Sequence, residues 1–384
     1  MRAARRPVHS ATVQHLFGSR EAYGLGVEEE LLLVEPHRPH RLDHRASEMI
    51  ARVGSEQLKP DVYEALVETA TPVCRDAHEA ARELEAVRGA LHRAGATLAG
   101  AGLHPSAAFG ELVHVQKPRY AEIHSSMRGL LERTPTCALH VHVGMPDPET
   151  AIATCNRLRA HLPLLQALAA NSPYWHGRDS GFATARAQLF RGFPRAVIPR
   201  AFDGWDDYAT AVGEWVAAGE MEDYTFLWWD IRPHPALGTV EVRAMDAQGR
   251  LATVCGLAAL IHALAAACAD GLGRVESGEA LTESSFRAGR DGLGATIWWE
   301  GSLRPVPEVA AAALALARPY AREQGAEDAL DEIERVLREG NGADRMRAAC
   351  ADGGMGAVLD GLVRETREPL YGYTRTTSPM RTQL

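Results

Sequence analysis

The chain has almost no lysine and no excess of positive charge. Lysine occurs only as Lys59 and Lys117, so arginine carries nearly all of the positive charge. This scarcity excludes a G-x-x-x-x-G-K-[ST] phosphate loop, and any bound nucleotide must be held in another way. The formal net charge is -9 over 384 residues. That balance argues against a nucleic-acid partner, because phosphate backbones attract basic surfaces.

The sequence also lacks paired cysteines and an uninterrupted apolar run. Its six cysteines show no C-x-x-C spacing, in a chain long enough to build a large core, so we expect buried thiols in a reducing compartment. The first 19 residues contain arginines but no continuous apolar stretch, which excludes a typical secretory signal. Residues 251–269 are apolar but interrupted by His262, which is more typical of a buried helix than of a membrane span. We therefore expect a cytoplasmic protein without a membrane partner.

The hydrophobic pattern predicts strands early in the chain and helices late. Strands are expected over 23–34, 62–71, 97–103, 137–145, 226–232 and 239–245, and helices over 76–94, 148 to about 170, 251–272, 306–324, 327–339 and 355–366. This order favours an α+β fold with mainly antiparallel pairing over alternating βαβ units. We expect a basic tail over residues 1–20 and a single domain over residues 21–384. Residues 171–199 read as a long irregular segment whose length and aromatic content indicate function.

Polar residues stand two apart in four of the segments that favour β-strand. The pairs are Glu28 and Glu30, His140 and His142, Asp230 and Arg232, and Glu241 and Arg243. Because successive strand residues point to opposite faces, each pair emerges on one side of a sheet. Carboxylates, imidazoles and guanidiniums on one sheet face suit a magnesium-nucleotide enzyme, since carboxylates hold the cation and arginine balances phosphate charge.

Each segment also has a simpler interpretation. The acidic run around Glu28 is compatible with a charged edge strand that resists aggregation. The two histidines of an H-x-H pair can ligate zinc, bind magnesium-associated water, hydrogen-bond phosphate or simply lie in the core. Glu68 is either a further carboxylate of the set or an ordinary surface residue. Asn171, Arg178 and Arg186 belong either to a loop that binds an anionic substrate or to an aromatic loop that is merely well packed.

Taken in order, these segments resemble the glutamate-cysteine ligase type 2 family of carboxylate-amine ligases. The resemblance rests on short stretches spread over nearly the whole chain in family order. They begin at residues 26–31, 67–74, 102–105, 140–144 and 171–179, and continue at 229–233, 241–243, 287–293 and 342–345. The resemblance implies a glutamine-synthetase-like fold, in which a curved antiparallel sheet forms a funnel backed by helices. It also implies a homodimer.

The family resemblance implies an ATP-dependent ligase that joins a carboxylate, typically the γ-carboxylate of glutamate, to an amine such as that of cysteine. The expected route is phosphoryl transfer to the carboxylate and attack of the amine on the acyl phosphate. A carboxylate is a poor electrophile, so this activation step is chemically reasonable. No nucleophilic serine or cysteine is required. The expected cofactors are ATP and Mg²⁺.

The resemblance also assigns roles to residues of this chain. Arg243 and Glu241 become catalytic, and Arg232, His140 and Arg243 are expected to contact the nucleotide. The expected substrate-binding residues are Asn171, Arg178, Arg186 and Glu64. At Glu64 and at Asp61 the chain departs from the residues usual in the family, and both positions are expected near the bound amino acid. The implied magnesium ligands are Glu28, Glu30, Glu68, His142 and Glu241.

Two other functions fit the same residues. One is metal-dependent hydrolysis, in which His140, His142 and a glutamate hold zinc and activate water. The other is a regulator that keeps the ligase fold and binds nucleotide without turnover. Formation of ADP that depends on magnesium, an acid and an amine distinguishes the ligase from both.

Overall fold

The computed structural model describes residues 14–370. In it, helices pack around one large β-sheet. The sheet has eight strands in the order β3-β4-β1-β6-β10-β9, and β2 and β5 also pair with β1. All of these pairings are antiparallel, which confirms the α+β class. The strands are β1 (Leu25–Glu35), β2 (Arg38–Leu42), β3 (Leu58–Pro60), β4 (Leu66–Ala70), β5 (Leu98–Ala99), β6 (Ala138–Gly144), β9 (Ile231–His234) and β10 (Thr239–Asp246).

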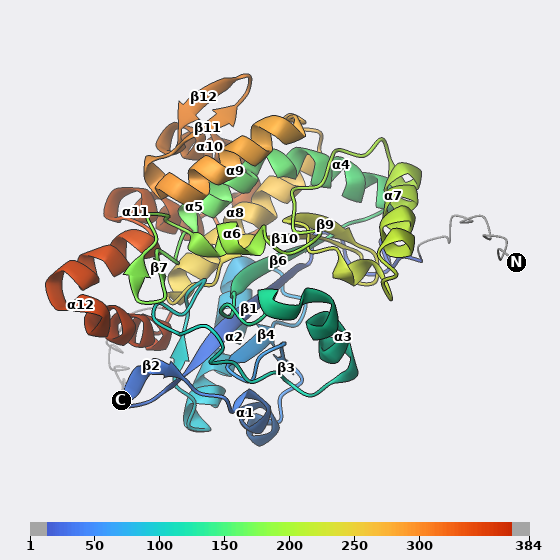
Figure 1. The fold of residues 1–384 in the computed structure, drawn as a ribbon. Helices are drawn as coiled ribbons and strands as arrows, with labels where there is room; N and C mark the ends of the chain where they lie inside the picture. The colour runs from blue at the N-terminus through green and yellow to red at the C-terminus, as the bar shows by residue number, and fades with distance from the viewer. Residues whose placement is uncertain (1–13, 371–384) are drawn as a thin grey trace, which may run out of the picture.

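Helices stack against this sheet and fill most of the remaining chain. Figure 1 shows α4, α5, α8 and α9 gathered above β6 and β10 in that view. Two small hairpins, β7 (Tyr174–Trp175) with β8 (Arg178–Asp179) and β11 (Thr296–Trp299) with β12 (Ser302–Pro305), lie outside the main sheet. The helices are α1 (Ala46–Val53), α2 (Ala77–Arg93), α3 (Pro118–Met127), α4 (Pro148–Leu158), α5 (Leu162–Leu168), α6 (Ala185–Phe190), α7 (Trp205–Ala218), α8 (Leu251–Ala269), α9 (Gly278–Asp291), α10 (Val306–Glu323), α11 (Asp331–Glu339) and α12 (Gly342–Arg367).

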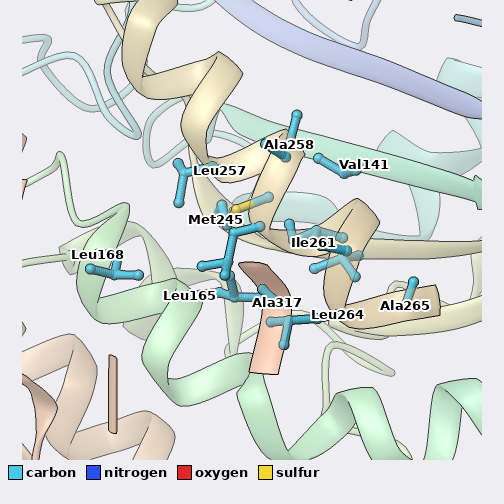
Figure 2. Packing of buried hydrophobic residues seen from close by; sticks show 14 of the residues in the cluster. Val141, Leu165, Leu168, Met245, Leu257, Ala258, Ile261, Leu264, Ala265 and Ala317 are labelled. Atoms are coloured by element: carbon cyan, nitrogen blue, oxygen red, sulfur yellow. The ribbon is translucent and has the colours of Figure 1, made fainter. Parts of the chain in front are cut away.

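The alternation of the central strands separates an apolar face from a polar one. Val27, Val141 and Val242 are fully buried and belong to the largest core cluster, together with most of α8. Figure 2 shows Val141 beside Ala258 and Ile261 of this helix. In each strand, the residues directly before and after the valine project from the other face of the sheet, because side chains alternate along a strand. The helices therefore cover the apolar face.

Glu29 is the exception on the apolar face, and its partner explains it. This carboxylate is completely buried and accepts two hydrogen bonds from Arg88 of α2, at 2.8 Å from Nε and 2.6 Å from Nη2. Arg88 also donates to the carbonyl oxygens of Gln248 and Gly249. The pair thus joins β1, α2 and the start of α8. This contact supplies a role that the sequence did not indicate.

Helix α8 is the one segment within residues 14–370 that is long and apolar enough to cross a membrane by length and composition. In the fold, 89% of its most apolar window is buried inside the protein. Its fully buried residues include His262, whose Nε2 lies 2.7 Å from the carbonyl oxygen of Tyr23. It therefore packs as the core helix that the sequence indicated.

Several predicted boundaries differ from the structure. The helix expected from 148 to about 170 divides into α4 and α5, separated by a short 3₁₀ turn, and Pro163 lies in the first turn of α5, where proline is tolerated. The strand expected over 226–232 begins only at Ile231. Tyr224–Phe226 form a 3₁₀ turn instead, because the side chain of Asp223 accepts from the amide of Thr225. The predicted helix 355–366 is the second half of α12, after a break at Gly354 where φ is 68°.

Five helices were not predicted at all: α1, α3, α6, α7 and α9. Helix α6 lies within the supposedly irregular segment 171–199, so that prediction was partly wrong. Its start is capped by Thr184, whose side chain accepts from the amide of Ala187. A cap of this kind does not stand out among the serines and threonines of a loop-like sequence.

Residues 14–20 of the predicted basic tail lie within the described part of the chain. Phe17 is buried in the main core and the amide of Leu16 donates to the carbonyl of Pro235 at 2.8 Å. Residues 14–20 are therefore attached to the fold. Residues 1–13 lie outside the described part of the chain, and the single-domain organisation remains a prediction.

Candidate active site

The strand register brings the predicted acidic and histidine residues together on the polar face. Glu30 of β1 lies directly opposite Glu68 of β4, and Glu28 lies opposite His140 of β6. Across the next pairings, Glu241 of β10 lies opposite both His142 and Arg232. Directly opposed side chains in an antiparallel sheet are close neighbours. Five strands, β1, β4, β6, β9 and β10, thus contribute to one polar surface.

This surface is the floor of a cavity of about 510 Å³. Most of the predicted functional residues line this cavity. The predicted residues in the lining are Glu28, Glu30, Asp61, Glu68, His140, His142, Arg186, Arg232, Glu241 and Arg243.

Three of these residues are arranged to hold a cation. One potential ligand atom from each of Glu28, His142 and Glu241 lies within 4.8 Å of the other two. His142 Nε2 is 3.6 Å from Glu28 Oε2 and 3.7 Å from Glu241 Oε1. This nitrogen is buried and has no hydrogen-bond partner within residues 14–370, while Nδ1 faces the hydroxyl of Thr239 at 3.0 Å. An unpartnered nitrogen between two carboxylates fits a metal ligand.

Glu241 is held by two guanidinium groups. Its Oε2 accepts from Arg232 Nε at 2.6 Å, and its Oε1 accepts from Arg243 Nη1. Burial raises the pKa of this carboxyl, but Arg232, Arg243 and His142 outweigh burial and hold the pKa well below its usual range. Glu241 is therefore ionised and fixed. The same contacts orient both arginines along the cavity floor.

The opposite side of the floor gathers carboxyl groups whose pKa values are raised by burial and by one another. Burial raises the pKa of Glu30 to about 8, with the charge of Asp61 as the next cause. Burial and the charge of Glu28 raise the pKa of Glu68 well above its usual range. The one nearby lysine, Lys59, has its Nζ 4.0 Å from Glu68 Oε1. Buried carboxylates that repel one another in this way are stabilised when a divalent cation is bound.

His140 and His142 differ although they are two residues apart. Burial and the charge of Arg243 lower the pKa of His140 to about 4. Burial also disfavours charge on His142, but Glu241 and Glu28 outweigh it and raise the pKa of His142. His140 Nδ1 lies 3.4 Å from Glu28 Oε2. His140 is thus a neutral ring beside the cluster of Glu28, His142 and Glu241.

Three predicted substrate-binding residues do not line this cavity. Glu64 accepts from the amide and hydroxyl of Ser47 at 2.9 and 2.7 Å and thereby caps α1. Arg178 is exposed on the β7–β8 hairpin, outside the cavity lining. Asn171 is buried in the core, where Nδ2 donates to the carbonyl oxygens of Gly100 and Ala247. Only Arg186 of this predicted set reaches the cavity.

Asn171→Ala is therefore expected to reduce stability without changing substrate affinity. The substitution leaves two buried carbonyl groups unpaired, which costs about 3 kcal/mol of unfolding free energy. Urea denaturation and the KM for the amino-acid substrate measure the two effects separately. Arg178→Ala, on the exposed hairpin, is the control that should change neither. A raised KM with normal stability would restore Asn171 to the binding site.

One of the four polar pairs also behaves differently from the prediction. Asp230 does not share the cavity with Arg232 but binds Arg191, with its Oδ1 2.9 Å from Nη1. Strand β9 starts one residue later, at Ile231, so the regular alternation does not extend to Asp230. Arg191 also contacts Ser285, which links this ion pair to α9.

Other cavity residues were missed by sequence analysis. Helix α3 contributes Arg119, Tyr120 and Ile123, and the segment between α6 and β9 contributes Phe193 and Trp228. No helix or strand was predicted for the segments that contain Arg119, Tyr120, Ile123 and Phe193. Trp228 lies in the predicted strand 226–232, but ahead of Ile231, where the observed strand β9 begins. The only available signal was the aromatic content of residues 171–199, which does bring Phe190 and Phe193 to the cavity wall.

Comparison with known proteins decides the family. The model of glutamate-cysteine ligase family 2 (GCS2) matches residues 24–365. This chain belongs to that family. A Rubrobacter xylanophilus protein provisionally named glutamate–cysteine ligase 2-3 is 38% identical over 361 residues, which are 91% of this chain and 99% of that protein. The glutamate–cysteine ligase of Halobacterium salinarum is 38% identical over 301 residues, 72% of this chain and 82% of its own length.

A solved structure supports the fold at greater distance. The crystal structure of the Francisella tularensis glutamate–cysteine ligase in complex with AMP superposes with a TM-score of 0.69. It covers 93% of this chain and 91% of its own, at 12% sequence identity. The GCS2 protein described here is an ATP-dependent ligase that forms C–N bonds. Family membership thus favours ligation over zinc-dependent hydrolysis.

Proposed function

We propose that this GCS2 protein activates the γ-carboxylate of glutamate by phosphorylation and joins it to the amine of an amino acid such as cysteine. The observation that carries the proposal is the convergence of four glutamates, three histidines and four arginines on one cavity. The names of its relatives specify glutamate and cysteine for those proteins. In this chain the substrates are a proposal.

Magnesium is the proposed cation, with Glu28, His142 and Glu241 as one ligand set and Glu30 and Glu68 as further ligands. The unpartnered Nε2 of His142 and the repulsion among the buried carboxylates support this fit. A bound magnesium ion would neutralise phosphate charge and hold the nucleotide in position. Oxygen-rich donor sets favour this hard cation over zinc.

The arginines are proposed to balance charge during the two chemical steps. In the first step, a carboxylate oxygen of glutamate attacks the γ-phosphorus of ATP, the bond to the β-γ bridging oxygen breaks, and ADP leaves. In the second, the amine attacks the carbonyl carbon of the acyl phosphate, loses a proton, and expels inorganic phosphate. Arg243 and Arg232 are held by Glu241, and in this proposal they stabilise the transferred phosphoryl group. His140 borders the same space and would contact the nucleotide.

Arg186 is proposed to bind a substrate carboxylate. It is buried in the cavity wall, its guanidinium lies over the Phe190 ring at 5.3 Å, and its Nε has no hydrogen-bond partner within residues 14–370. Asp246 Oδ1 is 3.8 Å from Nη1, too far for a hydrogen bond, so the guanidinium keeps donors for an anionic ligand.

Release of ADP tests the proposed function. The purified protein with ATP and Mg²⁺ is expected to form ADP only when glutamate and an amine are both present, and EDTA should stop the reaction. Replacing the amine with hydroxylamine should yield γ-glutamyl hydroxamate, which reports an activated acyl group. Absence of ADP with every acid and amine would leave the silent regulator as the correct description.

Glu241→Gln provides the site-specific arm of this test. It removes one charge of the ligand set and is expected to lower turnover at least about 100-fold, since even partners of a ligand contribute 10–100-fold. The matched control is Glu64→Gln, the same chemical change at the cap of α1 and outside the cavity, which should retain full turnover. Equal rates for both variants would refute the assignment of Glu241.

A further inference from the structure

A second group of metal-ligating side chains lies outside the ligand sets described above. It consists of His114, which forms an isolated antiparallel β-bridge with Tyr63, His124 in α3, and Glu132 just after the 3₁₀ turn Arg128–Leu130. His124 Nε2 is 3.1 Å and His114 Nε2 is 3.8 Å from the same oxygen, Glu132 Oε1. One ligand atom from each residue lies within 4.8 Å of the others. We propose that His114, His124 and Glu132 bind a zinc-class transition-metal ion.

The donor types and their spacing fit such an ion. Two imidazole nitrogens and one carboxylate oxygen form a set that Zn²⁺ and Co²⁺ accept, with a fourth position for water. Metal–nitrogen bonds of 2.0–2.1 Å place neighbouring ligands of a tetrahedral site about 3.3 Å apart. The separations of His124 Nε2 and His114 Nε2 from Glu132 Oε1, 3.1 and 3.8 Å, lie on either side of this value. One nitrogen of each histidine lies within 4.8 Å of the other, so side-chain rotation that draws the three ligand atoms together completes the geometry.

Hydrogen bonding within the cluster does not account for all of its polar atoms. His124 and Glu132 satisfy each other at 3.1 Å, but His114 Nε2 is buried and has no hydrogen-bond partner within residues 14–370. The two rings meet edge to face with centroids 4.6 Å apart. Two neighbouring imidazoles aimed at one carboxylate oxygen leave a nitrogen lone pair unused. A cation at the centre of the three residues would use it.

Two of the three ligands are held by backbone contacts before any metal binds. The amide of Val115 donates to the carbonyl of Val62 at 2.9 Å, which fixes the backbone beside His114, and the ring of His114 packs 5.4 Å from the Tyr63 ring. The carbonyl of Glu132 accepts from the amide of Gly110 at 3.0 Å. His124 is the more exposed ligand, with 46% of its side chain accessible, so the site is open to solvent on the α3 side.

Binding at this site would fix one wall of the active-site cavity. The same helix that carries His124 supplies Arg119, Tyr120 and Ile123 to the cavity lining, and Leu131 lies next to Glu132 in sequence. A metal bridging three chain segments would hold α3 in place relative to the sheet. The site is chemically distinct from the cavity floor, where most donors are carboxylates.

Cobalt titration tests the proposal. Metal-free full-length protein in excess Mg²⁺ is titrated with Co²⁺, whose visible absorption reports nitrogen and oxygen coordination, and then with Zn²⁺, which should displace it. We expect the wild type to bind one equivalent more than His124→Gln. The affinity of the variant for that equivalent should fall more than about 100-fold, since even a ligand's outer partner contributes 10–100-fold.

Two controls keep the result interpretable. Glu132→Gln should reproduce the loss seen with His124→Gln, and His37→Gln, at an exposed histidine outside the cluster, should bind metal like the wild type. Zn²⁺ should raise the melting temperature of the wild type and of His37→Gln, but not of the ligand variants. Equal stoichiometry and equal cobalt spectra for the wild type and both ligand variants would overturn the proposal. That result would not affect the proposed ligase activity.

Discussion

Arg243→Ala is expected to lower kcat of this GCS2 ligase about 1,000-fold while the protein stays folded. Arg243 lies in the cavity beside Glu241, and both Glu241 and the opposite glutamates raise its pKa despite burial, so it is fully charged. A guanidinium that stabilises a transferred phosphoryl group contributes 10³–10⁵ in rate in other phosphoryl-transfer enzymes. Release of ADP under saturating substrates measures the loss.

Two variants make this result specific. Arg178→Ala removes the same side chain from the exposed β7–β8 hairpin and should turn over like the wild type. Arg243→Lys keeps the charge but not the planar fork, and we expect a rate between those of Arg243→Ala and the wild type. Full activity of Arg243→Ala, with an unchanged melting curve, would exclude Arg243 from the chemical step.

Arg88→Met is expected to lower the free energy of unfolding by about 3–5 kcal/mol, because it leaves the carboxylate of Glu29 charged and unpaired in the core. Glu29 is completely buried and Arg88 is its bidentate partner. The substitution also removes donors from the carbonyls of Gln248 and Gly249. Urea denaturation of the wild type and the variant measures the difference.

The matched comparison is Arg38→Met, which breaks the exposed ion pair with Glu35 at 2.7 Å. Exposed pairs contribute less than about 1 kcal/mol, so this variant should remain close to the wild type. The double variant Glu29→Met with Arg88→Met should recover part of the loss, since no charge is then left unpaired. If Arg88→Met and Arg38→Met lose equally little, the buried pair is not important for stability.

The central strands and their polar faces were predictable because they depend on a local rule. Period-two alternation placed Glu28, His142 and Glu241 on one side of their strands and the intervening valines on the other, as the structure confirms. The same rule did not reach Asp230, because strand β9 begins only after it. The alternation also did not reveal that Glu29 pairs with Arg88, which is 59 residues away.

Residues in loops were predicted less well than residues in strands. Asn171, Arg178 and Glu64 were assigned to the substrate site on the basis of their type and order, but their side chains bind the core, face solvent and cap a helix. Their positions depend on how distant segments pack. By contrast, α3 reaches the cavity although its sequence carried no recognised signal.

The sequence alone determined the antiparallel strands, the face on which the acidic and imidazole groups emerge, and the ligase family. Each follows from alternation along a strand or from short motifs in a fixed order, which need no knowledge of distant contacts. Only the tertiary structure decided which of these groups, and which arginines, line one shared cavity. It also decided that His114, His124 and Glu132 lie close together. Strand register and helix packing set those distances, and both arise from contacts between residues far apart in the chain.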